Sequence, residues 1–428
     1  MRRAYYIERG VILFKELPGN IKIRLFTSFY TRIISVSVMP FMALFFSDRL
    51  GKVFAGTFLL ITTLASFIFR LWGGYIADRT RRKTVLVASN VSGSVLMVLM
   101  TICLLPSFDF IYAFAALYLV WSIVSSMGGP AMNALILDST DAENRKKVYV
   151  ISYWLDNISI SVGMALGGLM YKSHRLELFI LLSAALVVTT LIYILFLKDD
   201  QVNLLERTHV NPLRDILYNY ATAVRDRKYL MYVIGLIFFF SAEFAVSNYI
   251  GIRLKDSFSP INLFGLQIDG VRMMSAITIE NTLVVISLTF LISSLLERVS
   301  KLKAYLIGIL FYGIGYAALN VVNTWYGVLI FGLFAVIGEL TCVPIHMTEQ
   351  AKLIPDDKRA SYMAFGSLSF SGGDMLSRFG IILGAYLMAP AMAVYTCFIV
   401  ALGAFLVCIA FFGKEPQAVG IADTGQDA

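Results

Sequence analysis

The sequence predicts an all-helical integral membrane protein with twelve transmembrane helices, arranged as two pseudo-symmetric halves of six. Of its 428 residues, 58% are hydrophobic and only 15% are charged, whereas an average soluble protein carries about 25% charged residues. Apolar runs of about 20 residues, the length that spans a bilayer, recur along the whole chain, and the second half repeats features of the first. These observations exclude a soluble enzyme, a secreted disulfide scaffold and a disordered chain.

The apolar runs define the expected spans and domains. The first run is too long for the core of a signal peptide and should persist as a helix. The longest polar connection separates the sixth and seventh runs, so we divide the chain into an N-terminal six-helix half (1–198), a cytoplasmic linker (199–228), a C-terminal six-helix half (229–412) and a cytoplasmic tail (413–428). Within a few residues, the spans are expected at 22–47, 53–77, 84–106, 110–136, 147–171, 176–197, 229–252, 273–296, 303–322, 326–350, 360–388 and 391–412.

Basic residues indicate the orientation. Of the 36 Lys and Arg residues, 26 fall in the termini and the loops on their side, 7 in the loops of the other side and 3 within spans. Because Lys and Arg accumulate in cytoplasmic loops, we expect a multi-pass protein of a bacterial plasma membrane, with both termini in the cytoplasm. The formal net charge of +8 then reflects topology and attraction to anionic phospholipids. It does not require nucleic-acid binding.

An internal repeat relates the two halves. When the chain is shifted by half its length, the segment that begins at Pro130 lies over the segment that begins at Pro344, and Arg145 lies over Arg359. Two six-helix halves related in this way are the architecture of transporters that rock around a central cavity. The repeat therefore predicts a transporter.

The sequence contains no pattern for a cofactor or a structural metal. Its four cysteines lie singly in apolar runs, and its three histidines are widely separated, which indicates neither a disulfide framework nor a metal site. No phosphate-binding loop is present, so an ATP-driven pump is excluded. We expect no cofactor, no enzymatic activity and a monomer.

The loop after the second span carries a motif with a physical interpretation. It begins at Gly73-Gly74 and continues to the basic residues that follow Asp78. Glycines allow helices to approach closely, and an acid with basic neighbours at a helix end can pair with cations, helix carbonyl groups or lipid phosphates. The motif resembles the signature loop of the major facilitator superfamily, with Arg81 where that loop has its second glycine. We interpret it as a gating latch, against the alternative of a plain cytoplasmic loop, formed by Gly74, Asp78, Arg79, Arg82, Lys83 and, from the fourth loop, Arg145.

Further motifs resemble the drug/proton antiporters of this superfamily, most closely those of the LmrP type, over almost the whole chain. The segment Gly163–Gly168 is similar to their antiporter motif, with Met164 where proline usually stands, and the pair Tyr153-Trp154 also matches. The resemblance implies a major facilitator fold. It also implies roles in conformational coupling, proton movement and binding of cationic drugs for Asp78, Asp138 and Glu339.

Acidic side chains within the spans are the candidates for proton coupling. An ionisable group in the bilayer costs roughly 2.5–3.5 kcal/mol on insertion scales, so each is a functional candidate. Two family carboxylates are replaced by Ser152 and Ser247, with acids four residues away on the same helix faces. The proton-coupling candidates are Glu339, Asp138, Glu243, Asp156 and Glu280. The alternative for each is a structural hydrogen bond. Asp374 and Arg378, four residues apart, are expected to form a structural ion pair. Arg32 and Arg70 are expected to pair with membrane acids, with snorkelling toward the membrane surface as the alternative for Arg70.

Aromatic residues near these acids suggest a substrate site. An aromatic wall beside an acid attracts lipophilic cations through cation–π interaction, although ordinary packing is the alternative for each ring. The substrate-binding candidates are Glu339, Tyr153, Trp154, Asn157, Phe240 and Phe244. The sequence thus predicts a proton-coupled antiporter that exports lipophilic or cationic drugs by alternating access. A same-fold transporter of a specific metabolite or lipid, an uncoupled facilitator and a non-transporting membrane scaffold remain as alternatives.

Overall fold

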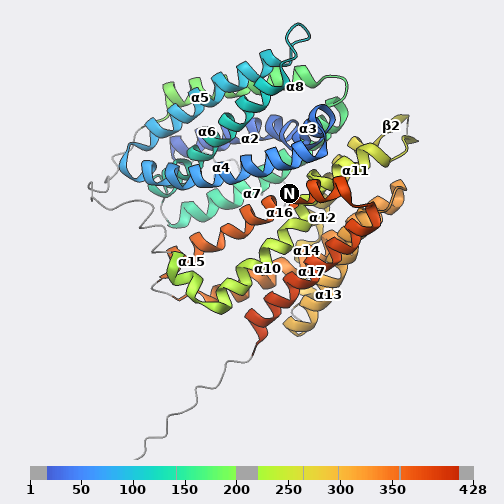
Figure 1. Cartoon of the computed structure of the whole chain (residues 1–428). Helices are drawn as coiled ribbons and strands as arrows, with labels where there is room; N and C mark the ends of the chain where they lie inside the picture. The colour runs from blue at the N-terminus through green and yellow to red at the C-terminus, as the bar shows by residue number, and fades with distance from the viewer. Residues whose placement is uncertain are drawn as a thin grey trace, which may run out of the picture.

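The computed structural model describes residues 17–140, 142–198, 220–263, 265–296, 298–355 and 358–413. Two bundles of helices lie side by side, one coloured from blue to green and the other from yellow-green to red (Figure 1). Ten helical segments of the described chain are long and apolar enough to cross a membrane. The other two predicted spans correspond to α7 and to α15 with α16, whose polar residues lower their hydropathy. Most of the expected linker and tail lies outside the described residues.

The described part of the N-terminal half contains seven helices and a short 3-10 turn. These are α2 (Gly19–Val36), the 3-10 turn η1 (Met39–Phe41), α3 (Met42–Leu50), α4 (Lys52–Arg79), α5 (Arg82–Cys103), α6 (Ile111–Asp138), α7 (Ala142–Met170) and α8 (Arg175–Phe196).

The C-terminal half repeats this arrangement and adds a small hairpin. Its elements are α10 (Arg227–Phe244), the 3-10 turn η2 (Ala245–Ser247), α11 (Tyr249–Ser257), β1 (Ile261–Leu263), β2 (Leu266–Ile268), α12 (Gly270–Leu296), α13 (Lys301–Leu319), α14 (Trp325–Leu353), α15 (Arg359–Gly366), α16 (Leu368–Tyr386) and α17 (Ala389–Phe412). The two strands pair antiparallel, and Gly265 between them has a φ of 79°, a backbone conformation that favours glycine.

The first helix of each half is broken at an equivalent place, which the hydropathy pattern did not predict. In the N-terminal half, Pro40 lies in the 3-10 turn η1 between α2 and α3, where its missing N–H interrupts the helix ladder. In the C-terminal half no proline is present at η2. Instead, Asn248 Nδ2 donates to the carbonyl oxygen of Phe244 at 3.0 Å, which satisfies an acceptor that the break releases.

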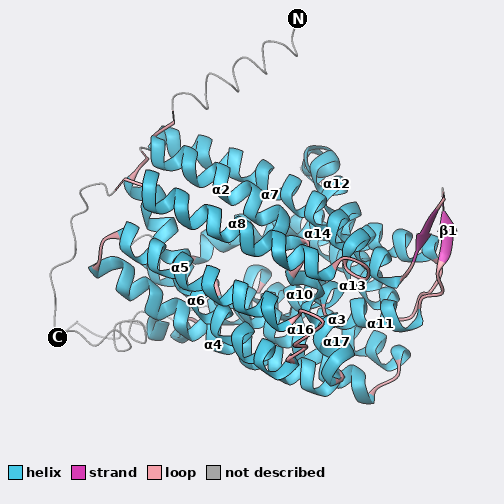
Figure 2. Cartoon of the chain, turned by 90° about the horizontal axis from the view of Figure 1, so that it is seen from above, coloured by secondary structure: helices cyan, strands magenta, loops and turns pink. Residues whose placement is uncertain are grey.

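The two ends of the bundle differ, and we name them for what they carry. The hairpin end holds β1 and β2, at the right edge of Figure 2, together with Lys52 and the α7–α8 connection. The basic end holds Arg82 at the start of α5 and Lys198 after α8. Between the ends, large apolar side chains such as those of Val95 and Phe405 are exposed, as expected for a surface that faces lipid.

Candidate functional site

In the described structure, two helix pairs that the internal repeat relates make most of the contact between the halves. Helix α4 packs on α16, and α7 packs on α12. Glycines permit both contacts: a Cβ atom added to Gly56 would lie 2.6 Å from Ile382 Cγ1, and one added to Gly168 would lie 2.5 Å from Ser275 Oγ. These distances are shorter than any stable carbon contact, so each pair is as close as its backbones allow.

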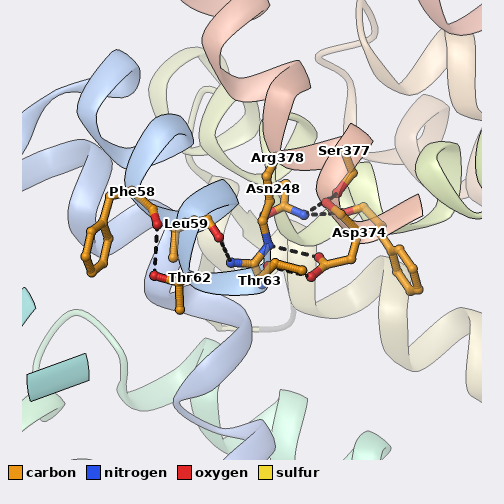
Figure 3. Close-up of polar contacts among 9 residues, drawn as sticks. Phe58, Leu59, Thr62, Thr63, Asn248, Asp374, Ser377 and Arg378 are labelled. Atoms are coloured by element: carbon orange, nitrogen blue, oxygen red, sulfur yellow. Dashed lines mark hydrogen bonds and ion pairs between the residues drawn. The ribbon is translucent and has the colours of Figure 1, made fainter. Parts of the chain in front are cut away.

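A polar cluster joins α4 to α16 within the membrane (Figure 3). Arg378 Nε donates to Asp374 Oδ1 at 3.0 Å, and its Nη1 donates to the carbonyl oxygen of Leu59 at 3.1 Å. Thr63 Oγ1 donates to Asp374 Oδ2 at 3.0 Å. The ion pair expected within α16 therefore also contacts the opposite half.

Among the described residues, three ion pairs join the halves at the hairpin end. Each has one partner on α3, α4 or the α7–α8 connection and the other on α11 or just before α12. The pairs are Lys52–Asp256 at 2.9 Å, Lys172–Asp269 at 2.7 Å, and Lys255 with Asp48. Together with the glycine contacts, they close the hairpin end in this conformation.

Asp269 has a second role at the start of α12. Its Oδ1 accepts a hydrogen bond from the backbone N–H of Arg272 at 3.0 Å, which caps the helix. Burial alone would raise the pKa of Asp269, but the hydrogen bonds from Lys172 and the Arg272 backbone outweigh it, and the pKa lies below its ordinary value. The Lys172–Asp269 contact is therefore an ion pair at neutral pH.

Two adjoining cavities lie against α6, and we call them together the arginine cavity. One, of about 350 Å³, lies between α4, α6 and α16 and is lined by Arg70 and Arg378. The other, of about 460 Å³, lies between α2, α5, α6 and α7 and is lined by Arg24 and Arg32. Trp121 and Ser125 line both.

Asp156, a proton-coupling candidate, lines the arginine cavity. Its Oδ1 lies 3.2 Å from Arg32 Nε, so its charge is balanced by a partner on α2. Arg70, by contrast, is exposed and forms no ion pair or hydrogen bond with another described residue.

A separate pocket of about 120 Å³ in the C-terminal half, the acid pocket, contains Glu243. The buried carboxyl group of Glu339 lies close enough for the two charges to repel. Asn281, which lines the pocket, donates through Nδ2 to Glu339 Oε2 at 2.8 Å. Among the described residues, no basic side chain forms an ion pair with either glutamate. Thr278 and Ser247 add hydroxyl groups to the lining.

Glu280 lies one residue from Asn281, at the contact between α12 and α14. Its Oε2 is buried without a hydrogen-bond partner in the described structure. A Cβ added to Gly332 of α14 would lie 2.7 Å from that oxygen. Glu280 therefore faces α14. Because Gly332 also lines the acid pocket, Glu280 lies beside that pocket.

The predicted aromatic residues separate into two groups. Phe240 and Phe244 contact Phe370 of α16, with ring centroids 5.6 Å and 4.7 Å from it, and Phe244 lines the acid pocket. Tyr153 and Trp154 instead line a cavity of about 360 Å³ between α7 and α12. The predicted substrate residues thus do not line one common cavity.

Asn157, the remaining substrate candidate, is engaged by its own helix. Its Nδ2 donates to the carbonyl oxygen of Tyr153, one turn earlier, at 2.8 Å. The amide N–H that makes this bond is already used within α7.

The predicted latch joins helices of the N-terminal half at the basic end. Arg82 Nε at the start of α5 lies 3.3 Å from Asp138 Oδ2 at the end of α6, which brings a gating candidate and a proton-coupling candidate together. Lys83 Nζ donates to the carbonyl oxygen of Ile194 on α8 at 3.1 Å. The side chain of Asp78 lies outside the part of the structure that is described.

The other latch residues make local contacts. Gly74 faces Pro130 of α6, whose Cβ would lie 3.7 Å from an added methyl group. Arg79 lies over the ring of Tyr75, 3.8 Å from its centroid. Arg145 Nη2 donates to the carbonyl oxygen of Thr140 at 3.0 Å.

The C-terminal half has a counterpart of the Arg82–Asp138 pair that the sequence comparison missed. Glu349 near the end of α14 is buried and pairs with Lys301 at the start of α13 at 2.5 Å and with Lys352 at 2.8 Å. The shift of 214 residues placed Lys352 over Asp138. The structural equivalent is Glu349, three residues earlier and almost one helical turn away, because the two halves do not keep one exact offset.

The fold and the repeat agree with comparison to known proteins. Residues 24–279 match the family model described as Major Facilitator Superfamily. The chain belongs to the major facilitator superfamily. It is 24% identical over 386 residues to a Na(+), Li(+), K(+)/H(+) antiporter of Planococcus maritimus, covering 87% of this chain and 91% of that protein.

Solved members of the superfamily share the architecture. A POT family transporter in complex with a thioalcohol-conjugated peptide superposes with a TM-score of 0.69 at 17% identity, covering 93% of this chain and 98% of that chain. An auto-inhibited POT family peptide transporter gives a TM-score of 0.71 at 12% identity, covering 96% and 99%. At these identities the likeness concerns the fold alone.

These findings confirm the major facilitator fold and the assignment as a multi-pass membrane transporter rather than an enzyme. The relative from Planococcus maritimus, which covers most of the chain, is itself named as an antiporter of alkali cations and protons. Multidrug efflux, and the likeness to the LmrP type in particular, stay predictions.

Proposed function

We propose that this transporter exchanges protons for monovalent alkali cations, and that the exchange takes place at the carboxyl groups of Glu243 and Glu339. The observation that carries the proposal is the acid pocket. Glu243 lines this pocket, and the buried carboxyl group of Glu339 lies close enough to repel it and accepts a hydrogen bond from Asn281 of the lining. No basic side chain among the described residues forms an ion pair with either glutamate.

Electrostatics make such a site an exchanger. A carboxylate withdrawn from water and left without a partner costs several kcal/mol, and two of them in one pocket repel each other as well. Binding either a proton or a cation removes this cost, so protons and cations compete for the site. Competition at one site that faces each side of the membrane in turn couples the two flows.

The size and chemistry of the pocket favour a small hard cation. Its volume is about 120 Å³, whereas sites for drug-sized ligands span roughly 300–1,000 Å³. Carboxylate, amide and hydroxyl oxygens are ligands that hard cations prefer, and Asn281, Thr278 and Ser247 supply the uncharged ones. The alkali-cation antiporter of Planococcus maritimus gives the same assignment by resemblance.

A lipophilic organic cation is the second candidate substrate. The cluster of Phe240, Phe244 and Phe370 extends from the acid pocket toward the arginine cavity, and aromatic faces attract such cations. Proton exchange at Glu243 and Glu339 would be the same in both cases. The candidates therefore differ in the cation and not in the coupling.

The proposed cycle uses the two ends of the bundle in turn. We place the basic end in the cytoplasm, in keeping with the distribution of Lys and Arg. The conformation closed by Lys52–Asp256 and Lys172–Asp269 is then closed on the external side. The Arg82–Asp138 pair would adjust the basic end as the halves rock.

Proteoliposomes with trapped pyranine test the proposal. External NaCl, LiCl or KCl should raise the lumenal pH in the presence of the wild-type protein, and choline chloride should not. Glu339→Gln and Glu243→Gln should abolish the response. Glu177→Gln, which makes the same chemical change at an exposed position on α8, should retain it.

The outcomes separate the candidates. A pH change driven by ethidium but by no alkali salt would replace the alkali cation with the lipophilic cation. Full activity of both glutamine variants, or no cation-dependent pH change at all from folded protein, would overturn the exchange mechanism.

A further inference from the structure

Among the described residues, four arginines and two aspartates line the arginine cavity. The arginines come from α2, α4 and α16, and the aspartates from α7 and α16. They are Arg24, Arg32, Arg70, Arg378, Asp156 and Asp374. Four positive and two negative groups leave a formal charge of +2 in the lining.

The pairing pattern identifies which arginines carry the excess charge. Arg32 is balanced by Asp156 at 3.2 Å, and Arg378 by Asp374 at 3.0 Å. Arg24 and Arg70 form no ion pair with a described acidic residue. Arg24 Nη1 donates only to the hydroxyl group of Ser152, at 3.2 Å, and its Nε is buried without a partner.

The unpaired hydrogen-bonding groups of the cavity are donors. The buried side-chain atoms in its lining that lack a partner among the described residues are Arg24 Nε and Trp121 Nε1, and both can only donate. Trp121 lies where the two parts of the cavity adjoin. Hydroxyl groups, among them those of Ser89, Ser122 and Ser125, line the remaining wall.

An unbalanced guanidinium group within a membrane protein is costly, and such groups mark substrate pathways. A carboxylate or phosphoryl group is its best complement, because two parallel N–H donors match two oxygens. The parts of the cavity, about 350 and 460 Å³, fall within the range of small-molecule sites. We propose that the arginine cavity is a binding site for a small organic anion that bears a carboxylate or phosphoryl group, with Arg24 and Arg70 as its principal ligands.

This proposal goes beyond the exchange at the acid pocket and does not depend on it. The two sites share no lining residue. The arginine cavity has the wrong charge for the lipophilic cation considered above, whereas an anion would balance it.

Binding of a matched series of probes to the purified full-length protein in phosphatidylcholine nanodiscs tests the site. Benzoate and phenyl phosphate should bind by calorimetry. Benzamide and benzamidine, which keep the ring and replace the anion with a neutral or a cationic group, should not. Arg70→Gln should weaken benzoate binding by about tenfold or more, the loss expected for a charge-assisted hydrogen bond. Arg49→Gln, at an exposed arginine of α3 paired with Asp109, should leave it unchanged.

The outcomes decide between the possible ligands and keep the two proposals apart. Glu339→Gln should still bind benzoate, with an affinity no lower than that of the wild type, while losing alkali-driven proton release, so that failure of one site does not mimic failure of the other. Arg24→Gln could prevent folding. The test therefore uses Arg70→Gln, because the Arg70 side chain makes no ion pair with a described residue. Equal binding of benzoate and benzamide, or unchanged affinity in Arg70→Gln, would overturn the proposal. Arginine-dependent retention of phosphatidylglycerol without binding of either soluble anion would assign the cavity to a lipid headgroup and overturn it too.

Discussion

The glycines at the contacts between the halves provide a direct test of how the hairpin end closes. Gly56→Ala and Gly168→Ala each add one methyl group between helices of opposite halves. The added Cβ would lie 2.6 Å from Ile382 Cγ1 in the first case and 2.8 Å from Ser275 Cβ in the second, so the helices must separate. Gly380→Ala on α16 is the matched control, because nothing lies within 4 Å of its added Cβ.

The size of the effect follows from packing. Overpacking by a methyl group costs typically about 1–3 kcal/mol, and effects at well-separated sites add. The double variant should therefore destabilise the closed hairpin end by about 2–6 kcal/mol. The open conformation, in which α4 and α16 have moved apart at the hairpin end, is not destabilised by the added methyl groups. Since 1.4 kcal/mol corresponds to a factor of ten, the ratio of closed to open molecules should fall by about 30-fold or more.

Distances between spin labels measure this ratio. We place the labels at Ser107 and Ser259, which are exposed on opposite halves at the hairpin end. In a background without the native cysteines but otherwise wild type, these labels should report a short distance. The double glycine variant should shift the distribution to longer distances, and Gly380→Ala should not. An unchanged distribution in the double variant would refute the reasoning that these contacts limit closure.

Three further predictions concern the ion pairs. Because the pKa of Asp269 is lowered by its pairing with Lys172 in the closed conformation, the pair contributes above the ordinary pKa of an aspartate and is lost as pH falls through the lowered value. The same labels should thus report opening below about pH 4, and Asp269→Asn should remove this pH dependence. Arg82→Gln and Asp138→Asn should each slow transport, with a double-mutant cycle that shows coupling; additive effects would contradict a direct pair. Glu349→Gln should lower the melting temperature, because it removes charge-assisted hydrogen bonds worth about 1.5–3 kcal/mol each.

The sequence predicted the helices well because bilayer thickness imposes their length. It failed where local backbone chemistry decides. The break at Pro40 could have been predicted from the proline, whereas the break before Asn248 depends on a side-chain hydrogen bond to Phe244 that leaves no pattern in a hydropathy profile. The hairpin around Gly265 was missed because strands of three residues carry too little periodicity.

The candidate acids were recognisable because charge is rare within spans, but their partners were not. Asp156 and Glu243 look alike in the sequence, each an acid in an apolar run. In the structure the first is paired with Arg32, and the second lies close enough to the carboxyl group of Glu339 for their charges to repel. The difference depends on the rotation of each helix, which one sequence does not give. The sequence alone did not single out Arg24, whose unbalanced charge becomes visible only when the cavity lining is known.

The separation of charge between the halves suggests how the two proposed sites could influence each other. The arginine cavity has an excess of positive charge, and the acid pocket becomes negative when its carboxyl groups lose their protons. Arg378 and Asp374 line the part of the cavity beside Phe370, which contacts Phe244 of the acid pocket, so the sites are neighbours in a medium where screening is weak. Deprotonated acids would partly satisfy the arginines and compete with an anion. Loading the acid pocket with protons or cations would remove that competition and strengthen anion binding. Charge balance of this kind would let one set of fixed side chains couple an anion in one half to a proton or cation in the other.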